Sequence, residues 1–274
     1  NSSAFANVWT VDLPLAPAEC VFDENQDYSL LSKSEKDAYF LCWKSYFMWK
    51  YGIKFWTTTA GTKGTDGMKP MLADNDQNSG FWTIYYLLLL PEHLREFIKF
   101  TGQLDVIIVE GKSGGTATNS KKWIRVGANS PVAAVHEFGH TLEFRIKYFP
   151  EIAADYNWSY DEIKKIFTTY NKVKGEPCPD PLPLGEWDCY SLTGSHHMVQ
   201  LFWAYVTKSD SFKKKALDQK FNKLNDVLFK KYSYLRDNIF YGKEYTQILD
   251  DPDSNVISTP EVSVPEFTLL KNCI

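Results

Sequence analysis

Residues 131–144, PVAAVHEFGHTLEF, decide the fold that we expect of this chain. Ser130 is a favourable N-cap, Pro131 suits the first helical position, and apolar residues follow at helical spacing, so the segment predicts a helix. On a helix with 3.6 residues per turn, His136 and His140 lie one above the other on one face. The segment therefore predicts two imidazoles side by side, with Glu137 next to them in the sequence.

Two histidines one helical turn apart can bind a single metal ion, and the adjacent Glu137 can reach a metal-bound water. Zinc lowers the pKa of such a water to near neutrality, and a neighbouring carboxylate can accept its proton. This His-Glu-x-x-His motif and the residues around it resemble the zincin metallopeptidases. The resemblance covers the motif helix and the order of the neighbouring elements, and it implies that His136 and His140 are zinc ligands.

A catalytic zinc ion normally has three protein ligands and one position for water, so the motif helix requires a third donor. In one large zincin group the motif continues His-x-x-Gly-x-x-His. This chain has Glu143 in place of the Gly and Ile146 in place of the last His, so that group is excluded. In the gluzincin group a Glu from a later helix completes the site. Here the later helix, predicted over residues 195–207, begins with His196 and His197.

The pair His196 and His197 is the favoured source of the third ligand, because imidazole is a common zinc ligand. A pair of histidines at a helix start can also simply face solvent. Three carboxylates are the alternative ligands: Glu186, Asp188 and Glu143. Glu143 follows His140 by three residues on the same helix face. We expect Glu143 either to face solvent or to lie beside the metal, where it would support a ligand or meet the substrate.

The order of elements predicts an α+β fold with two lobes, in line with the zincin resemblance. Residues 32–147 would form a zincin-like upper lobe, with a small mixed sheet and the motif helix. Residues 148–249 would form a mostly helical lower lobe that brings the third ligand. Residues 1–31 are predicted to be an extended arm and residues 250–274 an extended tail. The active-site cleft would lie between the two lobes.

Local signals predict the elements of the upper lobe. A capping box at Ser32–Glu35 opens a helix to about Tyr51, and residues 81–100 are helical with a break at Pro91. The β-branched and aromatic segments at residues 54–59 and 104–109 predict strands.

Two further segments lie just before the motif helix. Residues 111–119 are predicted to be a flexible turn, and residues 122–126 alternate polar and apolar as an edge strand does. In zincins the edge strand pairs with extended peptide substrate, a mode of recognition known as β-augmentation. The resemblance assigns that role to residues 122–127.

The composition excludes several partners. Of the 274 residues, 44% are hydrophobic and 23% charged, which is ordinary for a globular protein with a sizeable core. The net charge of −4 gives no reason to expect nucleic acid or an anionic membrane as partner. The longest apolar run, near residues 84–90, is too short for a membrane span.

Several features favour a secreted glycoprotein. Two Asn-x-Ser sequons begin at Asn1 and Asn157. A chain that starts at Asn1 without Met resembles a product whose signal peptide has been removed, although a trimmed sequence would start in the same way. The five cysteines lack Cys-x-x-Cys spacing and therefore favour disulfides over a zinc cluster. The candidate pairs are Cys178–Cys189 and either Cys20–Cys42 or Cys20–Cys273, with one cysteine left over.

The resemblance implies a metallopeptidase that hydrolyses peptide or protein substrates, with Zn²⁺ as cofactor and Glu137 as general base. The oligomeric state does not follow from the sequence. One alternative is a zincin fold that works as a catalytically silent binding or toxin-like module, which the missing downstream Glu favours. The other is a secreted glycan-binding or structural protein, rich in aromatic residues, in which the motif is a coincidence.

Overall fold

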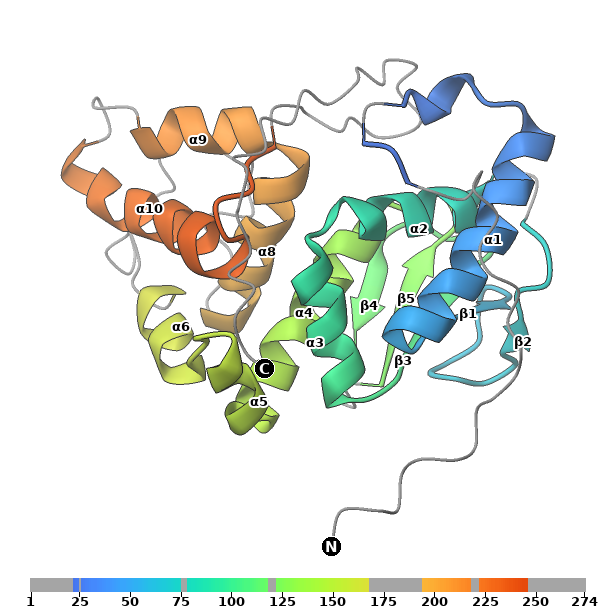
Figure 1. Ribbon diagram of the computed structural model, residues 1–274, viewed down its shortest axis with the longest axis horizontal. Helices are drawn as coiled ribbons and strands as arrows, with labels where there is room; N and C mark the ends of the chain where they lie inside the picture. Colours follow the sequence, from blue (N-terminus) through green and yellow to red (C-terminus); the bar gives the residue numbers. More distant parts are fainter. Residues whose placement is uncertain are drawn as a thin grey trace, which may run out of the picture.

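The computed structural model describes residues 22–24, 26–74, 78–117, 122–167, 194–217 and 222–245. Within these ranges, the side chains of residues 117, 194–197, 215 and 222–227 are not described. This part of the chain is a mixed α+β structure, with helices on one face of a five-stranded sheet and a group of further helices beside it (Figure 1). The predicted α+β class is therefore confirmed.

The sheet has the strand order β2-β1-β3-β5-β4. Its three inner strands run parallel, and the two outer strands run antiparallel to their neighbours. The strands predicted over residues 54–59 and 104–109 are confirmed as β1 and β3. The bounds are β1 Ile53–Thr58, β2 Lys69–Pro70, β3 Leu104–Val109, β4 Gly115–Ala117 and β5 Trp123–Gly127.

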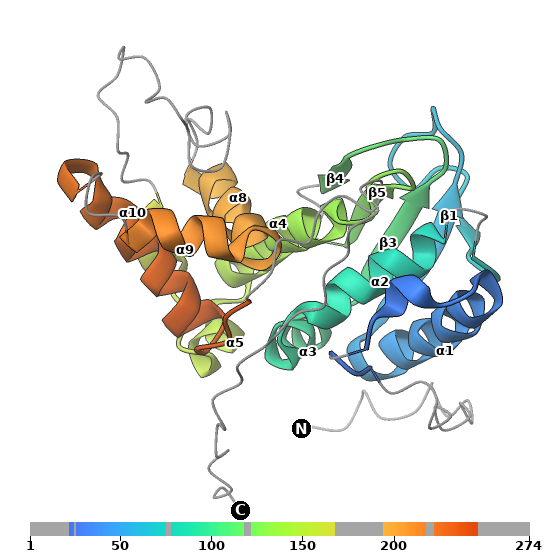
Figure 2. The ribbon, with the colours of Figure 1, turned by 90° about the horizontal axis from the view of Figure 1, so that it is seen from above.

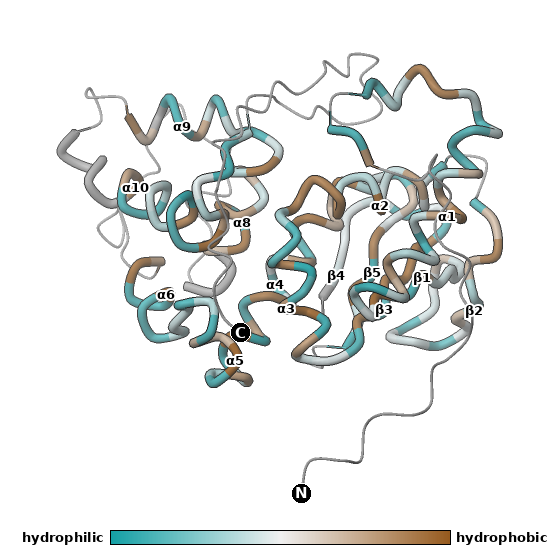
Figure 3. Tube along the Cα trace, viewed as in Figure 1, coloured by the Kyte–Doolittle hydropathy of each residue, from teal (hydrophilic) through white to brown (hydrophobic). Residues whose placement is uncertain are grey.

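One face of the sheet lies in the hydrophobic core. Leu104, Val106 and Ile108 of β3 belong to the core, as do Ile124 and Val126 of β5. Figure 3 shows the hydrophobic character of these strands, and Figure 2 shows helices α1, α2 and α3 together on one side of the sheet. Since side chains alternate along a strand, the residues between them point to the opposite face of the sheet. The helices on the core side are α1 Lys33–Tyr51, α2 Ser79–Leu89, α3 Glu92–Thr101 and α4 Ala133–Tyr148.

Helix α1 begins with the predicted capping box. The Ser32 hydroxyl accepts from the Glu35 backbone N–H, and the Glu35 carboxylate accepts from the Ser32 N–H at 2.7 Å. Gly52 ends the helix in the left-handed conformation (φ 66°), which glycine adopts without steric cost. The predicted break at Pro91 is also confirmed, because α2 ends at Leu89 and α3 starts at Glu92.

Two buried arginines bind the ends of helices. Arg95 donates to the carbonyl oxygens at the end of α2, those of Leu87, Leu88 and Leu90. Arg145 of α4 donates to those at the end of α3: Ile98 (2.6 Å), Gly102 (2.8 Å) and Gln103 (2.7 Å). The last carbonyls of a helix have no partner within it, so each guanidinium supplies the missing donors. Arg145 thereby fixes the motif helix to α3.

Helix α4 confirms the predicted motif helix, but its start differs. The N–H groups of Ala133 and Ala134 donate to the carbonyls of Ser130 and Pro131, each at 3.0 Å. These i→i+3 bonds form turns that lead into the helix, and no side chain caps its first turn. The prediction that Ser130 is the N-cap is therefore wrong.

Two predictions for the segments before α4 are also wrong. Residues 122–126 do form a strand, β5, but it lies between β3 and β4 and is not an edge strand. The edge strand on this side of the sheet is β4, which falls inside residues 111–119, the predicted flexible turn. Because both sides of β5 already pair with strands, residues 122–127 cannot also pair with a peptide.

The described residues after Tyr148 form helices and no strand. Helix α8 packs against α4, helices α6, α9 and α10 pack against α8, and α5 packs against α3 and α4 (Figures 1 and 2). None of the described helices combines the length and the apolar character that crossing a bilayer requires. The bounds are α5 Pro150–Asp155, α6 Tyr160–Phe167, α8 Gly194–Thr207, α9 Ser209–Leu217, α10 Asn222–Tyr234 and the π-helical turn Leu235–Ile239.

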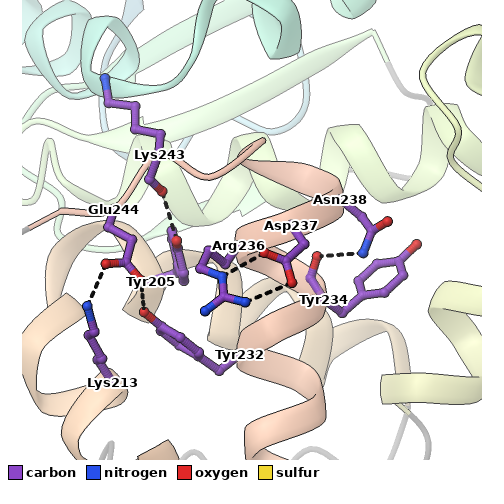
Figure 4. Close-up of polar contacts among 9 residues, drawn as sticks. All are labelled: Tyr205, Lys213, Tyr232, Tyr234, Arg236, Asp237, Asn238, Lys243 and Glu244. Atoms are coloured by element: carbon purple, nitrogen blue, oxygen red, sulfur yellow. Dashed lines mark hydrogen bonds and ion pairs between the residues drawn. The ribbon is translucent and has the colours of Figure 1, made fainter. Parts of the chain in front are cut away.

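The segment after the π-helical turn links these helices to the rest of the molecule. Glu244 accepts from Lys213 and from the Tyr232 hydroxyl, each at 2.5 Å (Figure 4). The buried Tyr245 hydroxyl donates to the carbonyl of Leu89 at the end of α2, at 2.7 Å. Lys243 pairs with Glu24 at 2.6 Å.

Candidate metal centre

The motif helix places His136 and His140 as the spacing predicts. Their ring centroids lie 4.9 Å apart with the planes at 79°, and both side chains are half-buried. Two nitrogen ligands of a tetrahedral zinc ion lie about 3.3 Å apart, given Zn–N bonds of about 2.05 Å. A centroid separation of 4.9 Å is compatible with that distance. The separation of the two rings therefore agrees with the spacing that two ligands of one ion require.

The carboxylate of Glu137 lies directly against the edge strand β4. Its side chain is only 4% exposed. A Cβ atom placed on Gly115 would lie 2.6 Å from Cγ and 2.7 Å from Oε1 of Glu137. Since no side chain fits at that distance, Gly115 is required for β4 to pass this close to Glu137. The general base expected from the motif is thus covered by the edge of the sheet.

The register of β4 determines which of its backbone groups face outward. Gly127 N–H donates to the Gly114 carbonyl at 2.7 Å, so residues 114 and 127 form a hydrogen-bonded pair. Pairs alternate along antiparallel strands, so Thr116 and Arg125 form the next such pair. The N–H and C=O groups of Gly115 and Ala117 consequently point away from β5. In the described part of the chain, no strand lies on that outer side.

Helix α8 approaches the motif helix at Gly139. A Cβ atom there would lie 3.1 Å from Cδ1 of Phe202 and 3.2 Å from Cγ1 of Val199. Glycine at this position therefore allows the two helices to pack closely. His196 and His197 lie in the first turn of α8, one turn before Val199, and their side chains are outside the described residues.

The third ligand predicted from the sequence is not identified by the described residues. Among them, no three His, Cys, Asp or Glu side chains are grouped so as to hold a metal ion. Glu143, which is described, therefore does not complete such a group with the two motif histidines. The other candidates, His196, His197, Glu186 and Asp188, lie outside what is described of the side chains.

Glu143 is a buried acid one turn beyond His140. Its side chain is 3% exposed, so the expectation that it faces solvent is wrong. Burial raises the pKa of its carboxyl to about 7, partly offset by the positive charge of Lys147. Its Oε2 atom accepts no hydrogen bond from the residues that the structure describes. Near neutral pH this group can therefore carry a proton that an ordinary glutamate has lost.

His93 is the one histidine far from both histidine-bearing segments in the sequence, and it has a structural role. Its ring stacks on Tyr241 with centroids 4.1 Å apart, and Nε2 lies 2.7 Å from the Ile239 carbonyl. Burial lowers the pKa of His93 to about 4. The imidazole is therefore neutral at pH 7 and donates its N–H to that carbonyl.

Only some of the residues that favour secretion lie in the described part of the chain. Asn157 is exposed, with a left-handed backbone (φ 57°), and the sequon at Asn1 lies outside the described residues. Cys42 is disulfide-bonded, and the other four cysteines lie outside the description. The pairings proposed for Cys20, Cys178, Cys189 and Cys273 therefore stay predictions.

Sequence reasoning missed the residues of β4. The signal was weak, because Gly115-Thr-Ala117 is too short for an alternating pattern and follows two glycines and a serine that are typical of turns. The position of Arg125 on an inner strand, opposite Thr116 of β4, was missed as well, because that strand was predicted to be the edge.

Comparisons with known proteins give no match: no family model matches the chain, and neither do curated proteins or solved structures. A functional proposal must therefore come from the residues of the centre.

Proposed function

We propose that this protein is a zinc-dependent metallopeptidase with a zincin-like arrangement. The observation that carries the proposal is the group formed by His136, His140 and Glu137 on α4, next to the edge of β4 with which no described strand pairs. Two imidazoles, a buried carboxylate and a strand edge that can accept a further strand are the parts that metal-dependent hydrolysis of an extended peptide requires.

The donors fit zinc better than a hard cation, because imidazole nitrogen is a preferred ligand of zinc and calcium and magnesium prefer oxygen. His136 and His140 would hold the ion, and a residue from the first turn of α8 or from the segment before it would complete the set. The close contact at Gly139 supports α8 as the source, because it brings that helix against α4. When bound, zinc supplies a Lewis acid and lowers the pKa of water.

Glu137 is the proposed general base. Its carboxylate would accept a proton from the attacking water and then donate it to the nitrogen of the leaving amine. The contact with Gly115 restricts where this carboxylate can lie, which orients it for proton transfer.

The edge of β4 is the proposed binding surface for the peptide. The resemblance had assigned this role to residues 122–127, and the strand order makes β4 the better candidate. The outward N–H and C=O groups of Gly115 and Ala117 would pair with the peptide backbone, as in β-augmentation. A peptide held there lies beside Glu137.

The decisive experiment measures zinc content and peptide cleavage together. We expect the purified protein to bind one zinc ion and to cleave members of a mixed peptide library. The matched control is Glu137→Gln, which should keep the zinc and the melting temperature and lose cleavage. Zinc binding with no cleavage of any peptide would favour a silent zincin-like binding module. Absence of stoichiometric zinc would leave the motif a coincidence.

We also propose that the protein is exported, since Asn157 is exposed and lies in a sequon. Expression through a eukaryotic secretory pathway should add a glycan that an endoglycosidase removes. Asn157→Gln should abolish that part of the mass shift. A mass shift that Asn157→Gln leaves unchanged would refute modification at this site.

A further inference from the structure

A pocket of about 270 Å³ lies beside β4, on the face of the sheet opposite α4. Its walls are the loop that follows β1, the loop that leads into β4, and the outward side of β5. The lining residues on which the argument rests are Lys63, Lys112, Thr116, Trp123 and Arg125.

The pocket is positively charged. Lys63, Lys112 and Arg125 line it, and no acidic residue is among the described residues that line it. Arg125 donates to the Gly64 carbonyl at 2.7 Å and to the Thr62 hydroxyl at 3.0 Å, which are both neutral. Among the described residues, none of the three cations forms an ion pair. The pocket therefore offers uncompensated positive charge around a fixed guanidinium.

The pocket and Glu137 lie on opposite sides of the same short strand. A Cβ on Gly115 would point at Glu137, whereas Thr116, the next residue, lines the pocket opposite its partner Arg125. Side chains of a peptide paired with β4 would alternate in the same way. The peptide residue opposite Thr116 would place its side chain over the pocket, and its two neighbours would point toward the motif helix.

We propose that this pocket is a specificity site for an acidic side chain of the peptide substrate. The inference rests on the proposed function, and it adds the substrate class: peptides with Asp or Glu at one position near the cleaved bond. The Asp or Glu carboxylate would be attracted over Thr116 toward the two exposed lysines, while Arg125 and Trp123 of β5 lie beyond Thr116 and Arg125 adds its positive charge from there. The adjacent positions show no such preference, because their side chains lie on the other face.

The test is a set of peptides that a library screen has shown to be cleaved, each remade with Glu, Gln or Lys at every position flanking the bond. At one position we expect kcat/KM to be about tenfold higher for Glu than for Lys, as several partly exposed charges together would give. The positions on either side of it should differ far less.

The double variant Lys63→Glu/Lys112→Glu assigns the preference to the pocket. It should invert the preference at that position from Glu to Lys, a change that loss of folding cannot produce. The matched control is Lys69→Glu/Lys99→Glu, which makes the same change in net charge at two exposed lysines away from the pocket.

The outcomes separate the two proposals. If no peptide is cleaved, the proposed function fails, and the inference fails with it. If peptides are cleaved with equal kcat/KM for Glu and Lys at every position, only the pocket inference is overturned. A preference for Glu that Lys63→Glu/Lys112→Glu leaves unchanged also overturns it.

Discussion

Gly115 and Glu137 are in direct contact across two elements, with the strand backbone so close that a Cβ on Gly115 would lie 2.6 Å from Cγ of Glu137. The sheet edge and the catalytic carboxylate of the proposed peptidase therefore cannot move independently. Any side chain at position 115 must displace one of them.

Gly115→Ala should consequently lower kcat/KM by about 100-fold, because a shift of roughly 1 Å in a catalytic group has an effect of that size. Zinc content should stay the same, since the three atoms nearest to such a Cβ all belong to Glu137. Steady-state kinetics and metal analysis of the same preparation check the prediction. Undiminished cleavage would mean that the position of Glu137 beneath β4 is unimportant for the reaction.

Loss of either motif histidine should weaken zinc binding by at least about 100-fold, because removing a residue that merely supports a ligand already costs 10- to 100-fold. His136→Ala and His140→Ala test this by competition with a metal-binding dye. The matched control is His93→Phe, which keeps an aromatic ring against Tyr241 and should keep zinc affinity unchanged. His196→Ala and His197→Ala, measured in the same way, identify the third ligand if α8 provides it.

Glu143 should make the zinc-free protein less stable as the pH rises. Its folded pKa of about 7 lies above the ordinary value of 4.5, so the folded state binds more protons than the unfolded state between these values. Stability is therefore greatest below about pH 4.5 with respect to this group and falls as the pH rises to about 7. Glu143→Gln should remove this slope and stabilise the protein at pH 8 by about 3 kcal/mol.

Urea unfolding at pH 5 and pH 8 measures this effect, and Glu162→Gln, an exposed acid on α6, is the control. A difference between the wild-type protein and Glu143→Gln that is the same at both pH values would contradict the raised pKa.

Arg145→Met should destabilise the fold by about 3 kcal/mol, because it removes the bonds of a buried guanidinium to three carbonyl groups at the end of α3. Lys147→Met, two residues along the same helix but exposed, should change the free energy of unfolding by less than about 0.5 kcal/mol. Chemical denaturation of both variants gives the comparison. Equal effects of the two substitutions would show that the bonds from Arg145 to α3 contribute little.

Local signals in the sequence were sufficient for much of the fold. The capping box of α1, the break at Pro91 and the helical spacing around His136 are properties of neighbouring residues, so the elements could be predicted directly. The position of β5 in the sheet could not be predicted. Polar and apolar residues alternate in the same way in an edge strand and in an inner strand of a sheet that has one solvent-exposed face. Which strand forms the edge depends on whether residues 115–117 pair with β5, and that segment is too short to show a strand pattern.

The burial of the charged residues Glu143 and Arg145 could not be predicted from the sequence either. For Glu143 the sequence left solvent and the side of the metal as alternatives, and for Arg145 it gave no signal, yet both side chains are buried and the end of α3 binds Arg145. The third ligand could not be chosen for a related reason. Spacing within one helix fixes His136 and His140, whereas the last donor depends on how another helix packs.

The bond from the Tyr245 hydroxyl to the Leu89 carbonyl joins residues 156 positions apart. With the pair Lys243–Glu24 it joins the end of the described chain to α2 and to the segment that precedes α1. The helical half is therefore attached to the layer that carries the sheet at two places, through α8 on α4 and through the chain end on α2. Both attachments must break before the two halves can separate.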